Sequence, residues 1–530
     1  MAHSASIKAA TAPSSGQCPA VGVPNRPRFT MSAPPQDLGD PADLFPESDA
    51  PRRPGRWASR FQAVVDEIGL QSLLRAHRDV KILFVQRIAR LFAYGQATLI
   101  LTLYFTALGF TDEQIGFFMT ATLFGDVIIS FFLTLFADAL GRRRVLMLGA
   151  TLMFISGVVF ATCDNFWILL LAAIAGVISP SGNEVGPFRA VEESTLAHLT
   201  PTDMRSDIYS WYALMGRVGS ALGTITSGNL TQALQVYLGW TNVRAYRIVY
   251  LFYSAVALFK LWTSFSLSEA CELGIDHPKV AAKARSAEGD RLLDAPDADD
   301  IALDDAPAAP RDAVAAEEGP AAPAKQPGRL NLKKYLPPLS AHSYKTLSVL
   351  LPLFFIDALG SGLTNFSWMT FYFTEKFHIR EASLGFLFFS AHVLAALAAL
   401  VAASNAKRFG LLRAMLIAHL PSSIILGLIP AVSNKALAMA LLIIRTGTNM
   451  MDIAPRQALI SSIVLPEERT SVMGFANVMR TFSTGIGPTI TGYMAARGTM
   501  WISFELAFGL KVLYDIGFIT FYLTFDMRRT

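Results

Sequence analysis

The sequence has little charge and almost no cysteine. Only 16% of its 530 residues are Asp, Glu, Lys or Arg, whereas a soluble chain carries about 25%. The three cysteines have no paired spacing and no histidine cluster nearby, so neither a disulfide framework nor a metal site is expected. A net charge of +4 is too small to indicate a nucleic-acid partner. We expect no cofactor and no enzymatic activity, because the apolar segments hold no nucleophile–base pair.

Hydrophobic residues make up 52% of the chain and gather in long runs. A run of about 18 apolar residues can cross the roughly 30 Å hydrocarbon core as a helix. Helices are expected because lipid offers the backbone no hydrogen-bond partner. Polar residues separate twelve such segments: 82–108, 114–137, 144–161, 166–185, 207–229, 247–268, 347–373, 382–403, 412–432, 436–453, 471–496 and 500–525. The sequence therefore predicts an all-α membrane protein with 12 transmembrane helices.

The segments outside these helices differ in composition. Residues 1–58 are rich in Pro, Ala and Ser and lack the apolar core of a signal peptide, which predicts a disordered tail. Residues 59–81 carry apolar side chains at helical spacing with basic residues among them, which is typical of an amphipathic helix on the membrane or a helix packed on the cytoplasmic face. Residues 269–345 are predicted to be a flexible linker between two six-helix bundles, 82–268 and 346–530.

The two bundles are also related in sequence. Tyr104-Phe105-Thr106 recurs as Tyr372-Phe373-Thr374, and a second set recurs in the same order: Arg205, Gly223 and Gly228 as Arg469, Gly487 and Gly492. Parallel repeats of six helices are a transporter architecture in which the substrate binds between the halves, near the membrane midplane. The pattern predicts two pseudo-symmetric bundles around such a site.

Basic residues in the short loops predict the orientation. The loops after the second and eighth segments are basic, whereas the loops 109–113 and 162–165 contain no Lys or Arg. Because cytoplasmic loops carry the excess of Lys and Arg, both termini and the linker are predicted to be cytoplasmic in a multi-pass membrane protein.

The loop after the second segment resembles the signature loop of the major facilitator superfamily. It reads Ala137-Asp138-Ala139-Leu140-Gly141-Arg142-Arg143-Arg144, with Thr134 and Ala139 where the family has Gly and a basic residue. The resemblance covers about 82–525 without the linker, and it implies the twelve-helix fold. It also implies a latch between the halves, formed by Asp138, Gly141, Arg142, Arg143 and Arg144; the alternative is that the arginines only set the topology.

Ionisable residues within the predicted segments are candidate site residues, because charge at membrane depth is costly. They are Arg90, Asp126, Arg217, Asp357, His392, Arg445 and Arg480. The arginines outnumber the aspartates, and a guanidinium group suits carboxylate or phosphate. This surplus predicts an organic anion as substrate, with Asp126, Asp357 or His392 carrying a proton. The alternative is that Arg–Asp pairs only tie helices together.

Other charged residues are assigned structural roles. Lys511 and Asp515 have i, i+4 spacing and are expected to pair with each other, and His419 is expected to be a packing residue. Two clusters of charged residues extend the fourth and tenth segments into the cytoplasmic loops. They are expected to form ion pairs between the halves or to be solvated: Glu184, Arg189, Glu192 and Glu193, and Arg456, Glu467, Glu468 and Arg469.

The function that these patterns predict is secondary active transport of a small solute by alternating access. We expect a monomer in the lipid bilayer, coupled to protons, that carries an organic anion. A multidrug or metabolite exporter is the alternative, although the glycine-rich run around Gly219 and Gly223 lacks the proline that the resemblance to proton-coupled exporters would require. An alternative of another class is a membrane sensor that keeps the fold without transporting.

Overall fold

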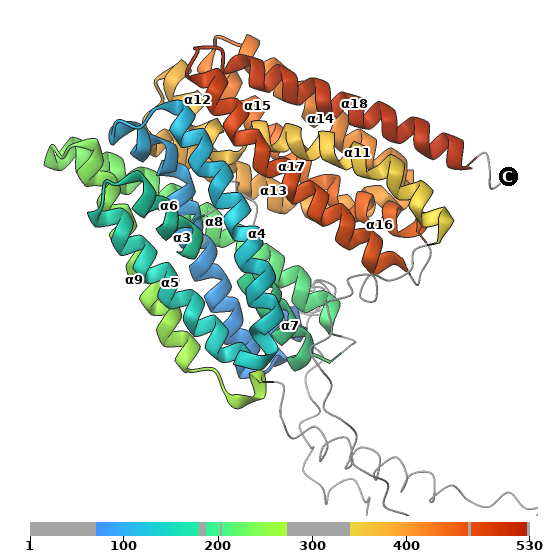
Figure 1. The fold of residues 1–530 in the computed structure, drawn as a ribbon, viewed down its shortest axis with the longest axis horizontal. Helices are drawn as coiled ribbons and strands as arrows, with labels where there is room; N and C mark the ends of the chain where they lie inside the picture. Colours follow the sequence, from blue (N-terminus) through green and yellow to red (C-terminus); the bar gives the residue numbers. More distant parts are fainter. Residues whose placement is uncertain are drawn as a thin grey trace, which may run out of the picture. The chain divides into compact units, whose positions relative to one another are not determined.

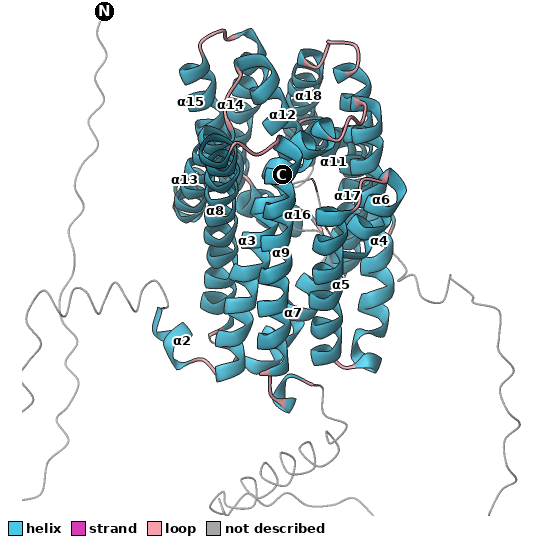
Figure 2. Cartoon of the chain, turned by 90° about the vertical axis from the view of Figure 1, so that its left-hand side faces the viewer, coloured by secondary structure: helices cyan, strands magenta, loops and turns pink. Residues whose placement is uncertain are grey.

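The computed structural model describes residues 70–176, 178, 180, 187–201, 204–272, 340–464 and 468–526. Within these ranges the regular elements are α-helices and one short 3₁₀ segment, and none is a strand (Figure 2). The predicted tail 1–58 and most of the predicted linker lie outside them. The surface helix predicted for 59–81 is described only from Leu70, where the chain forms α2 (Leu70–Arg75) and then enters α3.

The first half of the described chain contains the helices of the first six predicted segments (Figure 1). They are α3 (Arg78–Ala107), α4 (Asp112–Leu140), α5 (Arg142–Thr162), α6 (Phe166–Gly176), α7 (Pro187–Leu199), α8 (Arg205–Leu238) and α9 (Asn242–Phe265), followed by the 3₁₀ turn η2 (Glu269–Cys271). The helices begin and end within a few residues of the predicted limits, with three exceptions: α6 ends before the limit of the fourth segment, α7 lies beyond that segment, and α8 runs further than predicted.

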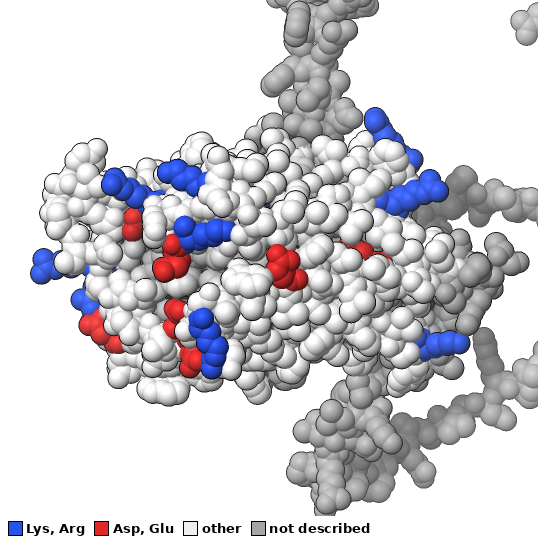
Figure 3. All heavy atoms as spheres, turned by 90° about the horizontal axis from the view of Figure 1, so that it is seen from above, with Lys and Arg blue, Asp and Glu red and all other residues white. Residues whose placement is uncertain are grey.

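The second half contains the remaining helices. They are α11 (Ala341–Leu363), α12 (Phe366–Phe377), α13 (Glu381–Phe409), α14 (Leu411–Ala431), α15 (Lys435–Met451), α16 (Ile453–Ile463), α17 (Arg469–Ala495) and α18 (Trp501–Asp526). Among the described residues, eight helices are long and apolar enough to cross a membrane. Exposed apolar side chains such as Leu171, Trp262 and Val478 leave the surface mostly uncharged, as Figure 3 shows from above.

One segment predicted as a continuous helix is interrupted. The seventh divides where the Asn365 side chain accepts a hydrogen bond from the backbone N–H of Trp368, which caps the start of α12. Hydropathy alone did not reveal this break, because the residues on both sides remain apolar. Two other segments are followed by a further helix that was not predicted. The fourth ends as α6 at Gly176, before its predicted limit, and helix resumes as α7 at Pro187. The tenth ends as α15 at Met451, close to its predicted limit, and α16 follows after Asp452, whose carboxylate pairs with Arg456 one turn later.

The two halves meet along three pairs of helices: α8 with α13, α4 with α17, and α3 with α12. Glycine allows two of these pairs to approach closely. A Cβ atom on Gly116 of α4 would lie 2.7 Å from the carbonyl oxygen of Pro488, and one on Gly385 of α13 would lie 2.7 Å from that of Thr224. Small residues of this kind let transmembrane helices pack backbone against backbone.

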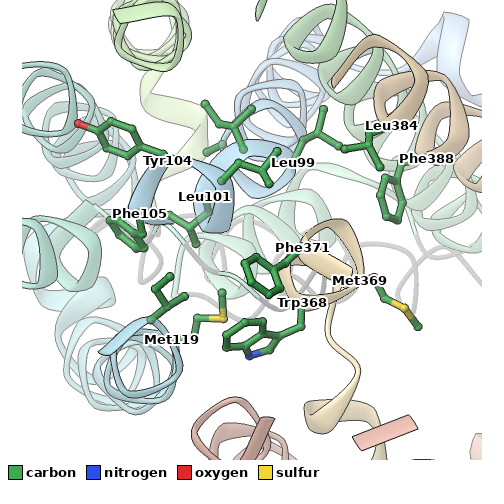
Figure 4. Close-up of a cluster of buried hydrophobic side chains, with 14 of the residues drawn as sticks. Leu99, Leu101, Tyr104, Phe105, Met119, Trp368, Met369, Phe371, Leu384 and Phe388 are labelled. Atoms are coloured by element: carbon green, nitrogen blue, oxygen red, sulfur yellow. The ribbon is translucent and has the colours of Figure 1, made fainter. Parts of the chain in front are cut away.

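A buried apolar cluster joins the same helices. It includes Leu99 and Tyr104 of α3, Met119 of α4, Trp368 and Phe371 of α12, and Leu384 and Phe388 of α13 (Figure 4). Polar contacts fix α12 within it, because Thr102 donates to the Ser367 carbonyl oxygen at 3.0 Å and Ser367 Oγ donates to the Thr98 carbonyl oxygen at 3.1 Å. The part of the seventh predicted segment that forms α12 is therefore held against the first half.

Candidate substrate and proton site

A buried carboxylate, Glu192 of α7, gathers the cations of the first half. Arg90 donates to it at 2.6 Å, the Lys260 ammonium lies 3.4 Å away, and the Tyr212 hydroxyl also donates to it. Arg87 completes this Glu192 cluster, because its guanidinium lies 4.2 Å from the centre of the Tyr212 ring. A charge in the interior needs such partners to offset its desolvation. The cluster therefore ties together α3, α7, α8 and α9.

The Glu192 cluster lies within one half. Glu192 was expected either to pair across the halves or to be solvated, and neither holds in this conformation, because it is buried among residues of its own half. Arg189 and Glu193, from the same group, form an exposed i, i+4 pair at 2.7 Å. Glu468 of the second group bonds to Ser340, also in its own half. Glu184 and Glu467 lie outside the described residues.

A second buried carboxylate, Asp357 of α11, gathers the cations of the second half. Its Oδ1 accepts from Lys511 Nζ at 2.8 Å and lies 3.3 Å from His419 Nε2. Its Oδ2 accepts from Arg456 at 3.1 Å and from Arg480 at 3.0 Å. Asp452 pairs with Arg456 and so belongs to the same group, as does Asp515. We call the whole group the Asp357 cluster: Asp357, His419, Asp452, Arg456, Arg480, Lys511 and Asp515. Both oxygens of Asp357 are occupied twice, so neither has an open position for a further donor.

Two sequence assignments in this region were wrong. Lys511 and Asp515 do not pair with each other but with Asp357 and with His419 Nδ1, the latter at 2.7 Å. His419 is not a simple packing residue, because both of its ring nitrogens face carboxylates. The physical reason is that α18 packs against both α11 and α14, so its polar face is turned toward those helices rather than along its own axis.

The other candidate site residues lie outside the Asp357 cluster. Arg445 on α15 has a buried Nε without a hydrogen-bond partner, and its guanidinium forms no ion pair with any residue that the structure describes. His392 on α13 stacks on the Phe366 ring, with centroids 5.9 Å apart. Arg217, from α8 of the first half, reaches the Met450 sulfur of α15 at 2.8 Å. Asp126 is fully buried on α4.

The structure thus separates the seven predicted site residues. It brings Arg480 to Asp357 and places Arg90 in the other half with Glu192. Sequence reasoning missed the role of Lys260 altogether. Glu192 and Arg456 lie just beyond the predicted segments, so the sequence left two alternatives for them, ion pairs between the halves or solvated charge, and did not place either in a buried cluster within one half.

The predicted latch residues contact their own half. Gly141 has φ 90°, which suits glycine, and forms the turn between α4 and α5. The backbone N–H groups of Arg142 and Arg143 donate to the Glu272 carboxylate at 2.7 and 3.1 Å, so Glu272 caps α5. Arg144 is exposed, and the side chain of Asp138 lies outside the described part.

Comparison with known proteins gives the family. The family model described as Major Facilitator Superfamily matches residues 82–292 and 350–524. An uncharacterized membrane protein of Saccharomyces cerevisiae, YJR124C, is 36% identical over 455 residues, which are 86% of this chain and 96% of that protein. A D-xylose transporter of Levilactobacillus brevis is 30% identical over 127 residues, but these cover only 24% of this chain and 26% of that transporter.

Solved structures share the fold at low identity. A D-xylose-proton symporter superposes with a TM-score of 0.58 at 16% identity, over 82% of this chain and 96% of its own. The nucleoside transporter NupG gives a TM-score of 0.58 at 14% identity, over 84% of this chain and 99% of its own. These matches confirm the all-α fold of two six-helix bundles, and the family is one of transporters rather than enzymes. The chain belongs to the Major Facilitator Superfamily of multi-pass membrane transporters.

Proposed function

We propose that this chain is a secondary active transporter that moves a small organic anion together with protons, by alternating access of its two halves. The observation that carries the proposal is Arg445. It places a guanidinium inside the predicted membrane region without an ion-pair partner among the described residues. Such a charge is costly unless it is used, and its planar fork matches a carboxylate or phosphate group.

The buried acids Asp357 and Glu192 are already paired with other residues and do not neutralise Arg445. Asp357 is fully occupied by its four donors, and Glu192 is held by Arg90, Lys260 and Tyr212. An anion that enters between the halves would therefore meet Arg445 as an unsatisfied donor. A ligand carboxylate would accept the hydrogen bond that Arg445 Nε lacks among the described residues.

Two further basic side chains lie near the same helix. Arg217 contacts Met450, which follows Arg445 by five residues, or about 7.5 Å along α15. His392 belongs to α13, which packs against both α8 and α15. The side chains therefore come from three helices near the junction of the halves, and the positive charge of Arg217 and Arg445 favours an anion over a cation.

Hydrogen bonds between the halves support an alternating-access cycle. Arg497 pairs with Glu113 at 3.3 Å, and the Tyr246 hydroxyl donates to Glu381 at 2.9 Å. These contacts lie at the end of the bundle that the basic loops predict to be outside. We therefore take this conformation to be closed on the outer side, with both termini in the cytoplasm, and expect the reverse tilt to open it.

The test is proton flux in proteoliposomes of the full chain under an imposed pH gradient, with a panel of organic anions and lipophilic cations. We expect saturable flux with an anion, loss of that flux in Arg445→Ala, and retention in Lys435→Ala, which changes an exposed basic residue at the start of the same helix. Flux driven only by cations would contradict the anion proposal and favour a drug exporter. Saturable binding without flux would favour the sensor.

A further inference from the structure

One imidazole in the second half bridges two carboxylates. His419 of α14 is 1% exposed; its Nδ1 lies 2.7 Å from Asp515 Oδ1 of α18, and its Nε2 lies 3.3 Å from Asp357 Oδ1 of α11. Of these three helices, α18 packs against both α11 and α14; all three are labelled in Figure 1. The arrangement is unusual because both nitrogens, rather than one, face an acceptor.

The two contacts of His419 require one proton more than a neutral imidazole and two ionised carboxylates carry. A neutral imidazole has one N–H donor and one lone pair. If both carboxylates were ionised, that lone pair would face an oxygen that can only accept, and burial excludes water from between them. Both contacts are satisfied when the three residues together carry one more proton, as an imidazolium or as a carboxylic acid.

The neighbouring charges decide where this proton can reside. Asp357 already accepts from Lys511, Arg456 and Arg480, so its oxygens are committed. Asp515 is held less tightly, because its Oδ2 is buried without a hydrogen-bond partner among the described residues. Three other charged or titratable residues face this region. Asp452 lies between α15 and α16 and pairs with Arg456. The ring of Tyr514 on α18 lies 5.3 Å from that of His419, and the carbonyl of Arg445 accepts a hydrogen bond from Ser422 of α14.

We propose that His419 and Asp515, anchored to Asp357, form the proton-binding site of the transport cycle. The proposal rests on the proton coupling proposed above and names the residues that carry it. In the conformation seen, the site holds this proton, either on the ring, whose two N–H groups then donate to Asp515 and to Asp357, or on a carboxylic acid that donates to the ring. When the proton leaves to water on the other side of the membrane, one of these two hydrogen bonds breaks and the lone pair of His419 is left facing a carboxylate.

The same site explains how a proton and an anion would bind together. Protonation adds one positive charge to the Asp357 cluster. Within this cluster the side chain of Arg480 is 29% exposed, whereas those of Asp357, His419, Lys511, Asp515 and Arg456 are at most 11% exposed. Arg480 is therefore the member of the cluster that a ligand can contact, and protonation of the cluster leaves less negative charge beside it. Thermodynamic linkage then requires the anion to strengthen proton binding by the same factor.

The first experiment counts the proton without measuring transport. The full chain is labelled with ¹⁵N-histidine and ¹³C-aspartate in lipid nanodiscs at pH 7, and spectra are compared with those of His419→Gln and Asp515→Asn. We expect an imidazolium signal lost in His419→Gln, or a carboxylic-acid signal lost in Asp515→Asn. His378→Asn is the control, because its left-handed backbone at φ 50° suits asparagine and its side chain is exposed. A neutral His419 ring with both carboxylates ionised would overturn the proposal.

The second experiment separates this site from the proposed function. In Asp515→Asn we expect proton-driven accumulation of the anion to fall at least tenfold, while exchange of anion between equal pools continues, because exchange moves no net proton. Coupled accumulation that survives in both Asp515→Asn and His419→Gln would overturn the site although the proposed function stands. Wild-type transport of the anion without protons would instead refute the coupling, and with it the role of this site in the cycle, whatever the spectra show.

Discussion

Lys511 Nζ lies 2.8 Å from Asp357 Oδ1, on a different helix, although Asp515 follows Lys511 by one turn on its own helix. Sequence spacing favours the local pair, whose contribution on an exposed helix is about 0.3 to 0.5 kcal/mol. In the interior a different pair forms, because a buried cation needs an ionised acid to offset its desolvation. Asp357 is the buried acid that Lys511 shares with Arg456 and Arg480. The longer-range pair therefore joins α18 to α11 and leaves Asp515 for His419.

Replacing Asp357 is expected to destabilise the second half. Asp357→Asn leaves Lys511, Arg456 and Arg480 without a shared acid, and breaking a buried pair costs about 3 to 5 kcal/mol. The measurement is thermal unfolding in detergent with and without the change. The double variant Asp357→Asn with Lys511→Met should be closer to wild type than the sum of the single changes. Additive losses would show that the two residues do not interact.

Two neighbouring glutamates on α7 provide a matched comparison. Glu192→Gln removes the acid that holds Arg90 and Lys260 in the interior, whereas Glu193→Gln disturbs only a surface pair with Arg189. We expect a loss of several kcal/mol for the first change and under about 1 kcal/mol for the second. Equal shifts in melting temperature would contradict the buried role of Glu192.

A larger side chain at Gly385 is expected to hold the outer side open. Its Cβ atom would meet the backbone of Thr224 across the halves, where nothing flexible can move away. Gly385→Leu should therefore raise the labelling, by a membrane-impermeant reagent, of a single cysteine placed at Thr102, which is buried against Ser367 of the opposite half. Gly509→Leu is the control, because no atom lies within 4 Å of a Cβ there. Labelling that is equal in both variants would argue against the glycine contact as part of the outer closure.

The two described cysteines should react differently with thiol reagents. Burial, and the nearby Asp79 carboxylate, raise the pKa of the Cys271 thiol to about 12, and the thiolate is the reactive form. Cys271 should therefore resist maleimide at pH 8, whereas Cys163 is partly exposed and should react. The measurement is mass spectrometry of the labelled peptides in a Cys18→Ser background. Because the raised pKa suppresses the thiolate, labelling of Cys271 should increase only as pH rises well above 8 or when the protein unfolds; rapid labelling of the folded protein at pH 8 would contradict this.

The sequence predicted the helices well and their partners poorly. Apolar runs of sufficient length locate helices, because the membrane leaves few other options. The break at Asn365 was missed, since a capping side chain is invisible to hydropathy. The pairing of His419 with two acids depends on how α11, α14 and α18 are rotated against one another, and side-chain packing sets that rotation. Glu192 was named but misplaced for the same reason.

The interruption at Asn365 bears on how the halves move. Although α12 follows α11 in the chain, it packs against α3 of the opposite bundle, and hydrogen bonds of Ser367 fasten it there. Meanwhile α11 stays with α17 and α18 through Asp357. A tilt of one bundle against the other must therefore bend the chain at Asn365 or slide α12 along α3. If the chain bends there, α12, a single helix of 12 residues, would move separately from α11, and the tilt would involve three pieces instead of two.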